Sequence, residues 1–460
     1  MNTDAKKNKL SVLQKLGYGF GDMGSNCFYA LVTTFLLAYL TDTAGLNAGI
    51  VGTLILVSKF LDGISDLFFG KLLDNTHSKM GKARPWVLWS SFPLALCLVM
   101  MFSVPFAMSK TAQYVYIFIV YVTANAICYT ANGIAYNTMT ALVTDDQAER
   151  VSMGAFRYPF SVLTNIAVAV LVMPMVNALG GGAVGWRITA VILAALEILG
   201  SVVAVMSVKE LPQDERRTGE SEGKKEEKLT LVELFKIIIH NHYYLLMFAI
   251  QFLIFLLNSF NSTSVWYFCN WQMGNAGLIG TFSVVSLAMI VGIAVSPALV
   301  KRYGMYKVNL VSFGLVAIFS VLMAASGYMK SMPLMLGTML IRSIAMGPLT
   351  GSINALVAEV ATFTRNTEGL SIEGSIYSCT TVGTKVGGGL GTAISGWLLA
   401  LGGYDGLAQT QTPLALQMIN ISYLVLPAIC AVLVTVCLWK LDVEKKNKEW
   451  EQAHSTDNEK

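Results

Sequence analysis

The stretch that decides the fold is Val57 to Trp86, VSKFLDGISDLFFGKLLDNTHSKMGKARPW. It begins as an apolar segment long enough to enter a lipid bilayer, yet Lys59, Asp62 and Asp66 lie within that segment. The three share one helical face, because Lys59 precedes Asp62 by three residues and Asp66 follows it by four. Charged groups inside a membrane are costly and usually face a polar interior, where they bind or relay a cation. We therefore predict a cation site at Asp62 and Asp66. The simpler alternative is a structural Lys59–Asp62 pair, with Asp66 reaching the membrane interface.

The composition predicts a membrane protein. Of the 460 residues, 54% are apolar and only 13% are charged, and the mean hydropathy is +0.58. Ordinary soluble domains carry about 25% charged residues. Apolar runs of roughly 20 residues, the length that spans a bilayer, recur near 17–40, 48–70, 86–107, 113–143, 156–178, 186–207, 241–266, 277–300, 308–328, 333–361, 373–401 and 415–439. We therefore predict an all-α integral membrane protein with twelve transmembrane helices.

The distribution of basic residues predicts the orientation. Most of the 32 Lys and Arg residues lie in the tails and in the loops that follow even-numbered helices, and Lys110, Arg187 and Lys330 are exceptions in the opposite loops. By the positive-inside rule, both termini are cytoplasmic. The polar, basic N-terminus precedes a full-length apolar run, so we expect a multi-pass protein of the plasma (inner) membrane without a cleaved signal peptide. The formal net charge of +4 gives no indication of a nucleic-acid partner.

An internal repeat predicts two related halves. The sequence NAGIVGT at 47–53 returns as NAGLIGT at 275–281, close to half the chain length away. Between the halves, 209–232 begins with a charged, Gly- and Pro-containing stretch that resembles a solvated linker. We therefore predict a six-helix bundle at 1–208, a cytoplasmic linker at 209–232, and a second six-helix bundle with a short tail at 233–460. This layout is typical of major facilitator transporters.

The sequence contains no constellation that indicates catalysis. HExxH, GxSxG and paired CxxC motifs are absent, and the four His residues lie in loops or at helix ends. The seven Cys residues are scattered in or beside apolar segments without metal-ligand spacing. We therefore predict a protein that is not an enzyme and has no cofactor other than a coupling ion, Na+ or H+.

Four motifs carry a resemblance to a known family. They are YGFGDMGSN at 18–26, DGISD at 62–66, GKARPW at 81–86 and TDDQAER at 144–150 with Arg157 following. Together they resemble the glycoside–pentoside–hexuronide:cation symporters, and the similarity extends over the whole chain. The resemblance implies that the ion, sodium or a proton, binds at Asp62 and Asp66 with Thr130. It further implies sugar contacts at Arg157, Thr381 and Lys385.

The chain also departs from the melibiose-type members of that family. Asn26 and Gly133 stand where those carriers have acids, and Asn137 and Thr350 stand where they use tryptophans against the sugar. We therefore expect a substrate other than melibiose. Asp22, one turn before Asn26, is a substitute first-helix acid.

Amides, carboxylates and cations can bind sugar hydroxyls in a cavity. The polar side chains predicted to do so are Asp22, Asn26, Asn132, Asn137, Arg157, Thr381 and Lys385. For Asn137, an interhelical hydrogen bond is an equal alternative, and Lys385 is expected to pair with Asp62 or Asp66 or to meet an anionic substrate. The resemblance also implies an inner gate between Arg150 and Glu359. For Arg342 we expect a structural ion pair, and Glu197 receives no role.

We therefore predict cation-coupled symport of a glycoside, pentoside or hexuronide by alternating access, by a carrier that is monomeric. A carrier for another solute, such as a lysophospholipid or another small organic anion, is the alternative. A membrane sensor that transports nothing is disfavoured, because the linker and tails offer no signalling domain. The identity of the sugar and the choice between Na+ and H+ stay open.

Overall fold

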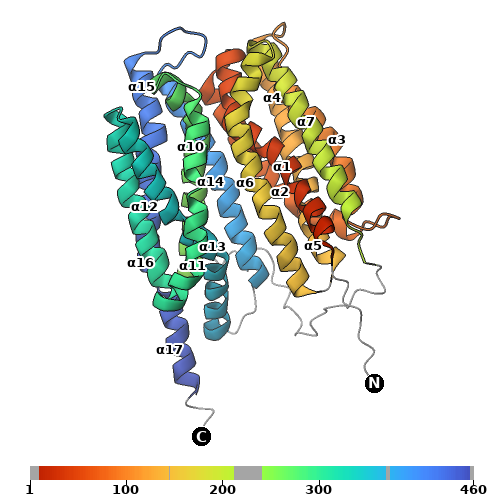
Figure 1. Cartoon of the computed structure of the whole chain (residues 1–460), viewed down its shortest axis with the longest axis vertical. Helices are drawn as coiled ribbons and strands as arrows, with labels where there is room; N and C mark the ends of the chain where they lie inside the picture. Colours follow the sequence, from red (N-terminus) through yellow and green to blue (C-terminus); the bar gives the residue numbers. More distant parts are fainter. Residues whose placement is uncertain (1–9, 145, 212–240, 369–372, 456–460) are drawn as a thin grey trace. The chain divides into compact units, whose positions relative to one another are not determined.

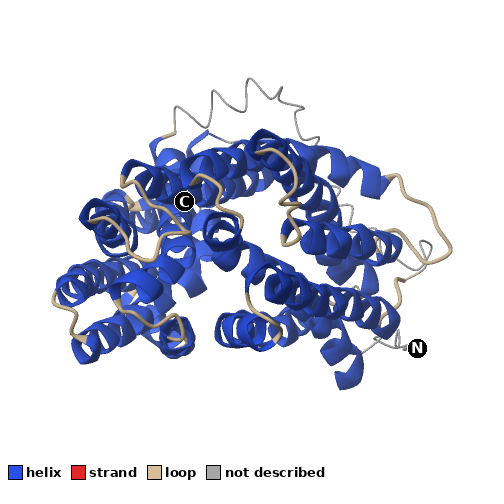
Figure 2. Ribbon diagram, turned by 90° about the horizontal axis from the view of Figure 1, so that it is seen from above, coloured by secondary structure: helices blue, strands red, loops and turns tan. Residues whose placement is uncertain are grey.

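The computed structural model describes residues 10–144, 146–211, 241–368 and 373–455. Throughout this part the regular structure is helical, as the helices coloured along the chain in Figure 1 and the all-helix ribbon of Figure 2 show. Eleven helical segments in the described part are long and apolar enough to cross a membrane, and α14 (Glu373–Leu401) covers the remaining predicted span. The prediction of an all-α, twelve-span membrane protein is therefore confirmed.

The described helices follow the predicted spans closely. Those of the N-terminal half are α1 (Val12–Ala38), η1 (Tyr39–Thr43), α2 (Ala48–Asp74), α3 (Arg84–Met101), α4 (Lys110–Val122), η2 (Thr123–Tyr129), α5 (Thr130–Val143), α6 (Gln147–Ala178) and α7 (Gly182–Ser207). Those of the C-terminal half, besides α14, are α9 (His242–Tyr267), η3 (Phe268–Gln272), α10 (Leu278–Ser286), α11 (Met289–Tyr303), α12 (Met305–Tyr328), α13 (Met332–Glu368), α15 (Pro413–Asn420), η4 (Ile421–Val425), α16 (Leu426–Lys440) and α17 (Val443–Ser455). The elements labelled η are short π-helical turns that continue an α-helix.

The chain divides into two compact units. The first unit spans Met1–Ser221 and also takes in Asn275–Gly280 and Leu399–Thr412, and the second unit holds the rest of the C-terminal half. In the loop at 399–412, which groups with the first unit, the Tyr404 hydroxyl donates to Asp42 Oδ1 at 2.8 Å. The predicted division at 209–232, which counts this loop with the C-terminal bundle, stays a prediction. The predicted linker, 209–232, lies outside the described residues except for its first three positions.

In the first unit, two glycines let α1 and α7 approach closely. A Cβ on Gly24 would lie 2.7 Å from the Glu197 carbonyl oxygen, and one on Gly200 would lie 2.9 Å from the Gly24 backbone. Small residues at helix contacts are the usual way in which membrane helices pack, because the apolar solvent adds no hydrophobic drive. This contact fixes α1, the helix that carries Asp22 and Asn26.

The loop between α2 and α3 has a structural partner that the sequence did not reveal. Glu210, just after α7, accepts hydrogen bonds from the backbone N–H groups of Lys82, Ala83 and Arg84, at 2.8, 2.8 and 2.9 Å. A carboxylate at a helix N-terminus satisfies donors that the helix cannot. Gly81 is required there, since it has a φ of +106° and a Cβ would lie 2.4 Å from the Glu210 carboxyl.

In the second unit, α11 and α13 touch backbone to backbone. A Cβ on Gly292 would lie 2.0 Å from the Ile344 carbonyl oxygen, and one on Gly347 would lie 2.5 Å from the Gly292 carbonyl carbon. Around this contact, buried residues of α9, α12, α13 and α16 form the core, among them Phe260, Val316, Val357 and Val434. The predicted span 277–300 is broken into α10 and α11.

The tail that follows the last predicted span contains a further helix that the sequence analysis did not predict. This helix is α17, in which Asn447 donates to the Glu359 carboxylate on α13 at 2.7 Å. Glu444 of the same helix accepts from the Tyr306 backbone N–H at 2.8 Å and so caps α12. Polar contacts between short segments distant in sequence explain why the hydropathy pattern did not predict this helix.

We expect Gly347→Ala to destabilise the protein, because a methyl group has no room against the α11 backbone. Gly337→Ala on the same helix is the matched control, since no atom lies within 4 Å of its added Cβ. Thermal unfolding of the two variants in detergent should show a lower midpoint for Gly347→Ala alone. Equal midpoints would show that α11 and α13 can separate without cost.

Candidate functional site

The predicted cation site is partly assembled around Asp62. This carboxylate is 6% exposed on α2, and its Oδ1 accepts a hydrogen bond from the Thr130 hydroxyl at 2.6 Å. Its Oδ2 lies 3.8 Å from the Lys59 ammonium, an ion pair between residues one turn apart. The π-helical turn η2 ends directly before Thr130 and packs against α2, so it sets the face on which Thr130 meets Asp62. The structure therefore brings together two of the three predicted ligands.

Asp66, the third predicted ligand, lies one turn further along α2 and is half-buried. Within the described part of the chain, no group of three His, Cys, Asp or Glu side chains is close enough to hold a metal ion. A sodium ion at Asp62 would thus take its further oxygens from hydroxyl, carbonyl or water groups, which are the hard ligands that such ions favour.

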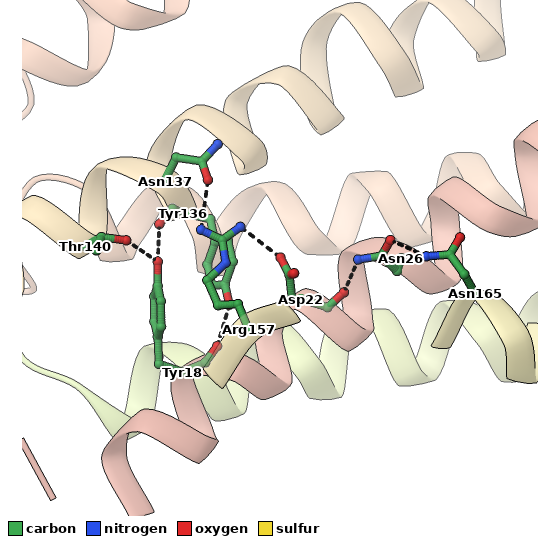
Figure 3. Close-up of polar contacts among 8 residues, drawn as sticks. All are labelled: Tyr18, Asp22, Asn26, Tyr136, Asn137, Thr140, Arg157 and Asn165. Carbon is green, nitrogen blue, oxygen red and sulfur yellow. Dashed lines mark hydrogen bonds and ion pairs between the residues drawn. The ribbon is translucent and has the colours of Figure 1, made fainter. Parts of the chain in front are cut away.

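A second polar cluster, drawn in Figure 3, surrounds Arg157. Its guanidinium lies 2.8 Å from Asp22 Oδ1 on α1 and donates to the Asn137 side-chain oxygen on α5 at 2.9 Å. The side chains of Arg157 and Asp22 are 22% and 15% exposed, so the ion pair lies at the edge of solvent. Arg157, on α6, thereby joins three helices of the first unit.

Two stacked aromatic rings lie against this guanidinium. Tyr18 and Tyr136 are stacked with ring centroids 4.7 Å apart, and the Arg157 guanidinium carbon lies 4.4 Å from the Tyr136 centroid. The Tyr18 hydroxyl donates to the Tyr136 carbonyl at 2.8 Å and contacts the Thr140 hydroxyl at 2.7 Å, while the Tyr136 hydroxyl donates to the Tyr18 carbonyl. Cation–π contact and reciprocal hydrogen bonds hold the rings and the arginine in one arrangement.

Asn26 continues the cluster along α1. Its amide nitrogen donates to the Asp22 carbonyl at 2.7 Å, and its side-chain oxygen accepts from Asn165 at 2.8 Å (Figure 3). Asn165 lies on α6 two helical turns after Arg157, so α1 and α6 face each other with matched polar residues. Asp22, Asn26, Asn137 and Arg157, all predicted sugar contacts, therefore lie in one connected network.

Asn132 differs from those four. It is 1% exposed, and its amide nitrogen donates to the Val87 carbonyl at 3.0 Å and to the Ser90 hydroxyl at 3.1 Å. Both partners lie on α3, so the side chain joins α5 to α3. This geometry favours an interhelical packing role for Asn132 over contact with a sugar.

We therefore expect Asn132→Ala to lower stability by about 1–3 kcal/mol, because it leaves buried groups of α3 without a donor. Uptake per folded carrier should stay near the parent value. Asn137→Ala, on the exposed side of the same helix, should lower uptake per folded carrier and leave stability near the parent value. Thermal unfolding and uptake measured on both variants check this. Normal stability with lost sugar affinity in Asn132→Ala would favour the predicted sugar contact, which stays a prediction.

The remaining predicted site residues are distributed over both units. Arg150 donates to the Thr144 carbonyl at 2.8 Å and the Ala141 carbonyl at 3.1 Å, at the end of α5. Glu359 is bound by Asn447, as described above. Lys385 is half-buried on α14, and the side chain of Thr381 on the same helix lies outside the described residues. The roles predicted for these residues stay predictions.

Two membrane charges were given no part in transport by the sequence analysis. Glu197 is fully buried on α7, where Ser201 donates to its Oε1 at 3.3 Å and its Oε2 has no hydrogen-bond partner among the described residues. Arg342, on α13, was expected to form a structural ion pair, and this expectation is wrong. Among the described residues no carboxylate lies within ion-pair distance of Arg342, whose one polar contact is the Met323 sulfur at 3.5 Å.

Sequence reasoning missed four members of the Arg157 network: Tyr18, Tyr136, Thr140 and Asn165. A signal was present for two of them, because Tyr18 lies one turn before Asp22 and Asn165 two turns after Arg157. Tyr136 and Thr140 carry no such signal, since an aromatic or threonine in a membrane helix is ordinarily a packing residue.

Comparison with known proteins agrees with these observations. Residues 17–445 match the family model described as MFS/sugar transport protein. The chain is 26% identical over 460 residues to the isoprimeverose transporter of Lactiplantibacillus pentosus, covering 98% of this chain and 94% of that protein. It is 28% identical over 450 residues to the glucuronide carrier protein homolog of Escherichia coli (strain K12), covering 94% and 93%.

A solved structure shares the fold. The D-xylose–proton symporter superposes with a TM-score of 0.62 at 14% identity, covering 93% of this chain and 95% of that one. Such a likeness shows the architecture alone, and it is that of the major facilitator superfamily. The family match, which spans nearly the whole chain and agrees with the motifs at 18–26, 62–66 and 81–86, shows more. The chain is a transporter and not an enzyme, and it belongs to the MFS/sugar transport family, in the branch of the glycoside–pentoside–hexuronide:cation symporters.

Proposed function

We propose that this symporter binds its coupling cation at Asp62 with Thr130 and Asp66, and its sugar at Asp22, Asn26, Asn137 and Arg157. The observation that carries the proposal is the pairing of a buried, hydrogen-bonded carboxylate with a neighbouring polar network at the edge of solvent. Carboxylates, amides and a guanidinium are the groups that bind sugar hydroxyls bidentately.

We propose that the two sites influence each other through Tyr129, which directly precedes Thr130. Its ring stacks on Phe28 and Tyr29 of α1, the helix that carries Asp22 and Asn26, with centroids 5.2 and 6.4 Å apart. A cation that neutralises Asp62 changes the field at the sugar site, and in return the bound sugar tightens cation binding by the same factor. Lys59 already occupies one side of Asp62, so an arriving cation shares or displaces this ion pair.

We further propose a glycoside, pentoside or hexuronide as the substrate. The matched relatives are named for isoprimeverose and for glucuronides, a neutral and an acidic sugar class. Thr381 and Lys385 are proposed as sugar contacts from the second unit, and Arg150 and Glu359 as the inner gate. We also propose a monomeric carrier of the plasma (inner) membrane with both termini cytoplasmic, from its basic-residue distribution.

The experiment that tests the function is uptake into right-side-out vesicles. A labelled panel of neutral glycosides, pentosides and hexuronides is offered with a sodium gradient, with a pH gradient, or with neither. Gradient-driven accumulation of one class is expected. Equal uptake with and without both gradients would show a carrier without cation coupling.

Thr130→Val should distinguish the two ions. A sodium ion loses an oxygen ligand in this variant, so the sodium concentration for half-maximal uptake should rise about tenfold or more. A carrier driven by protons needs no oxygen ligand from Thr130, so this variant should leave its uptake near the parent value. Uptake measured against sodium concentration distinguishes the two cases. An unchanged response of a sodium-driven parent would remove Thr130 from the site.

A further inference from the structure

Among the described residues, Arg342 of the second unit has no carboxylate partner. It lies ten residues into α13, roughly 15 Å along the helix axis, which is about half the thickness of a bilayer core. The side chain is 7% exposed. Its Nε is buried without a hydrogen-bond partner, and one terminal nitrogen contacts the Met323 sulfur at 3.5 Å. A thioether is a weak acceptor, so the guanidinium lacks the oxygens that normally compensate such burial.

Two hydroxyl-bearing side chains are the candidate neighbours of Arg342. Tyr423, in η4, interacts electrostatically with Arg342, and η4 packs against α12, the helix that carries Met323. The ring is 2% exposed and stacks on Phe268 with centroids 4.6 Å apart, so the position of the hydroxyl is fixed. On α12, Ser320 lies one turn before Met323, and its hydroxyl is buried without a partner among the described residues.

Among the described residues, a buried guanidinium without an oxygen acceptor and a buried hydroxyl without a partner lie on adjacent helices, an arrangement that an anion completes. An isolated buried guanidinium costs several kcal/mol, whereas the same group beside a small anion recovers this energy as a charge-assisted hydrogen bond. The enclosure favours an ion over a sugar, because the surroundings are packed core residues of α12, α13 and η4.

We propose that Arg342, together with Tyr423 and Ser320, binds a small inorganic anion of the halide class, such as chloride, inside the second unit. This site shares no residue with the proposed cation and sugar sites. A bound anion at this site stabilises the second unit.

The test is direct binding of 36Cl− to the purified carrier by equilibrium dialysis, at constant sodium concentration with gluconate as the replacing anion. Saturable binding of about one chloride per chain is expected. Bromide should displace it. Thermal unfolding in chloride should have a midpoint about 2 °C or more above that in gluconate, because a ligand that binds the folded state alone stabilises it.

Arg342→Gln should abolish both the binding and the chloride-dependent shift. Arg187→Gln, which removes one positive charge from an exposed position on α7, should leave both unchanged. Absence of saturable 36Cl− binding to the folded parent would overturn the proposal even if Arg342→Gln does not fold. The proposal would also be overturned if glucuronate, and not bromide, displaced bound 36Cl− and raised the unfolding midpoint. The guanidinium would then bind the acidic group of a substrate. Neither readout requires transport, so failure of the proposed transport function leaves this test intact.

Discussion

Asp62→Asn is expected to abolish the stimulation of uptake by the ion gradient. The amide keeps the size of the side chain but removes the charge that faces Lys59 and accepts from Thr130. Without it, Asp66 alone remains as a proposed counter-charge for the cation, and sugar and ion lose their coupling. Coupling free energies between ligands usually correspond to about 5- to 150-fold in affinity, so the gain in sugar affinity that the cation gives, a factor in this range, should be lost.

Asp405→Asn is the matched control for this variant. It removes a carboxylate from the first unit at a loop position, where Asp405 Oδ1 caps the Leu407 N–H at 3.0 Å, a role that an amide can fill. Gradient-driven uptake should match the parent in the control and fall to the gradient-free level in Asp62→Asn. Accumulation against a gradient by Asp62→Asn would refute the cation site.

The second large effect is expected at the Asp22–Arg157 pair. Asp22→Asn leaves the guanidinium without its charged partner, and removing one member of a buried pair typically costs about 2–5 kcal/mol. Partial exposure of both side chains places the expected loss of stability toward the lower end. Sugar uptake should also be lost, since the network that positions Asn137 and Asn26 depends on this pair.

The double variant Asp22→Asn with Arg157→Gln separates the two effects. Neutral amides at both positions leave no unpaired charge, so the unfolding midpoint should recover toward that of the parent. Uptake should not recover, because the charged groups proposed to bind the sugar are gone. If uptake returned together with stability, the pair would be a structural link between α1 and α6 only.

Most of the architecture could be predicted from the sequence, because apolar runs of bilayer length and the placement of basic residues are strong, local signals. The features that were missed depend on single polar contacts between distant segments. The loop at 399–412 contacts Asp42 through Tyr404, and α17 is held to α13 through Asn447. Neither contact alters the hydropathy of the chain, so neither can be predicted from the hydropathy pattern.

The candidate site could likewise be predicted only in part. Asp62, Thr130, Asp22 and Arg157 could be nominated because ionisable or hydroxyl groups in membrane helices match a family motif. What the sequence could not supply is which polar groups face one another. It placed Asn132 among the sugar contacts, although its partners lie on α3, and it expected an acid beside Arg342. Which side chains face one another depends on the rotation of each helix about its axis. Hydropathy specifies this rotation only weakly in a membrane, because most of the surroundings are apolar.

The π-helical turn η2 has an evolutionary consequence. A π turn holds one more residue than the α-helical turn it replaces, so deleting a single residue between Thr123 and Tyr129 would restore a regular helix. Everything on one side of the deletion would then rotate by about 100° relative to the other. Thr130 would leave Asp62 while the membrane span kept its length and apolar character. Descendants of this carrier could therefore lose or regain the contact between Thr130 and Asp62 through one codon, without any substitution at either residue.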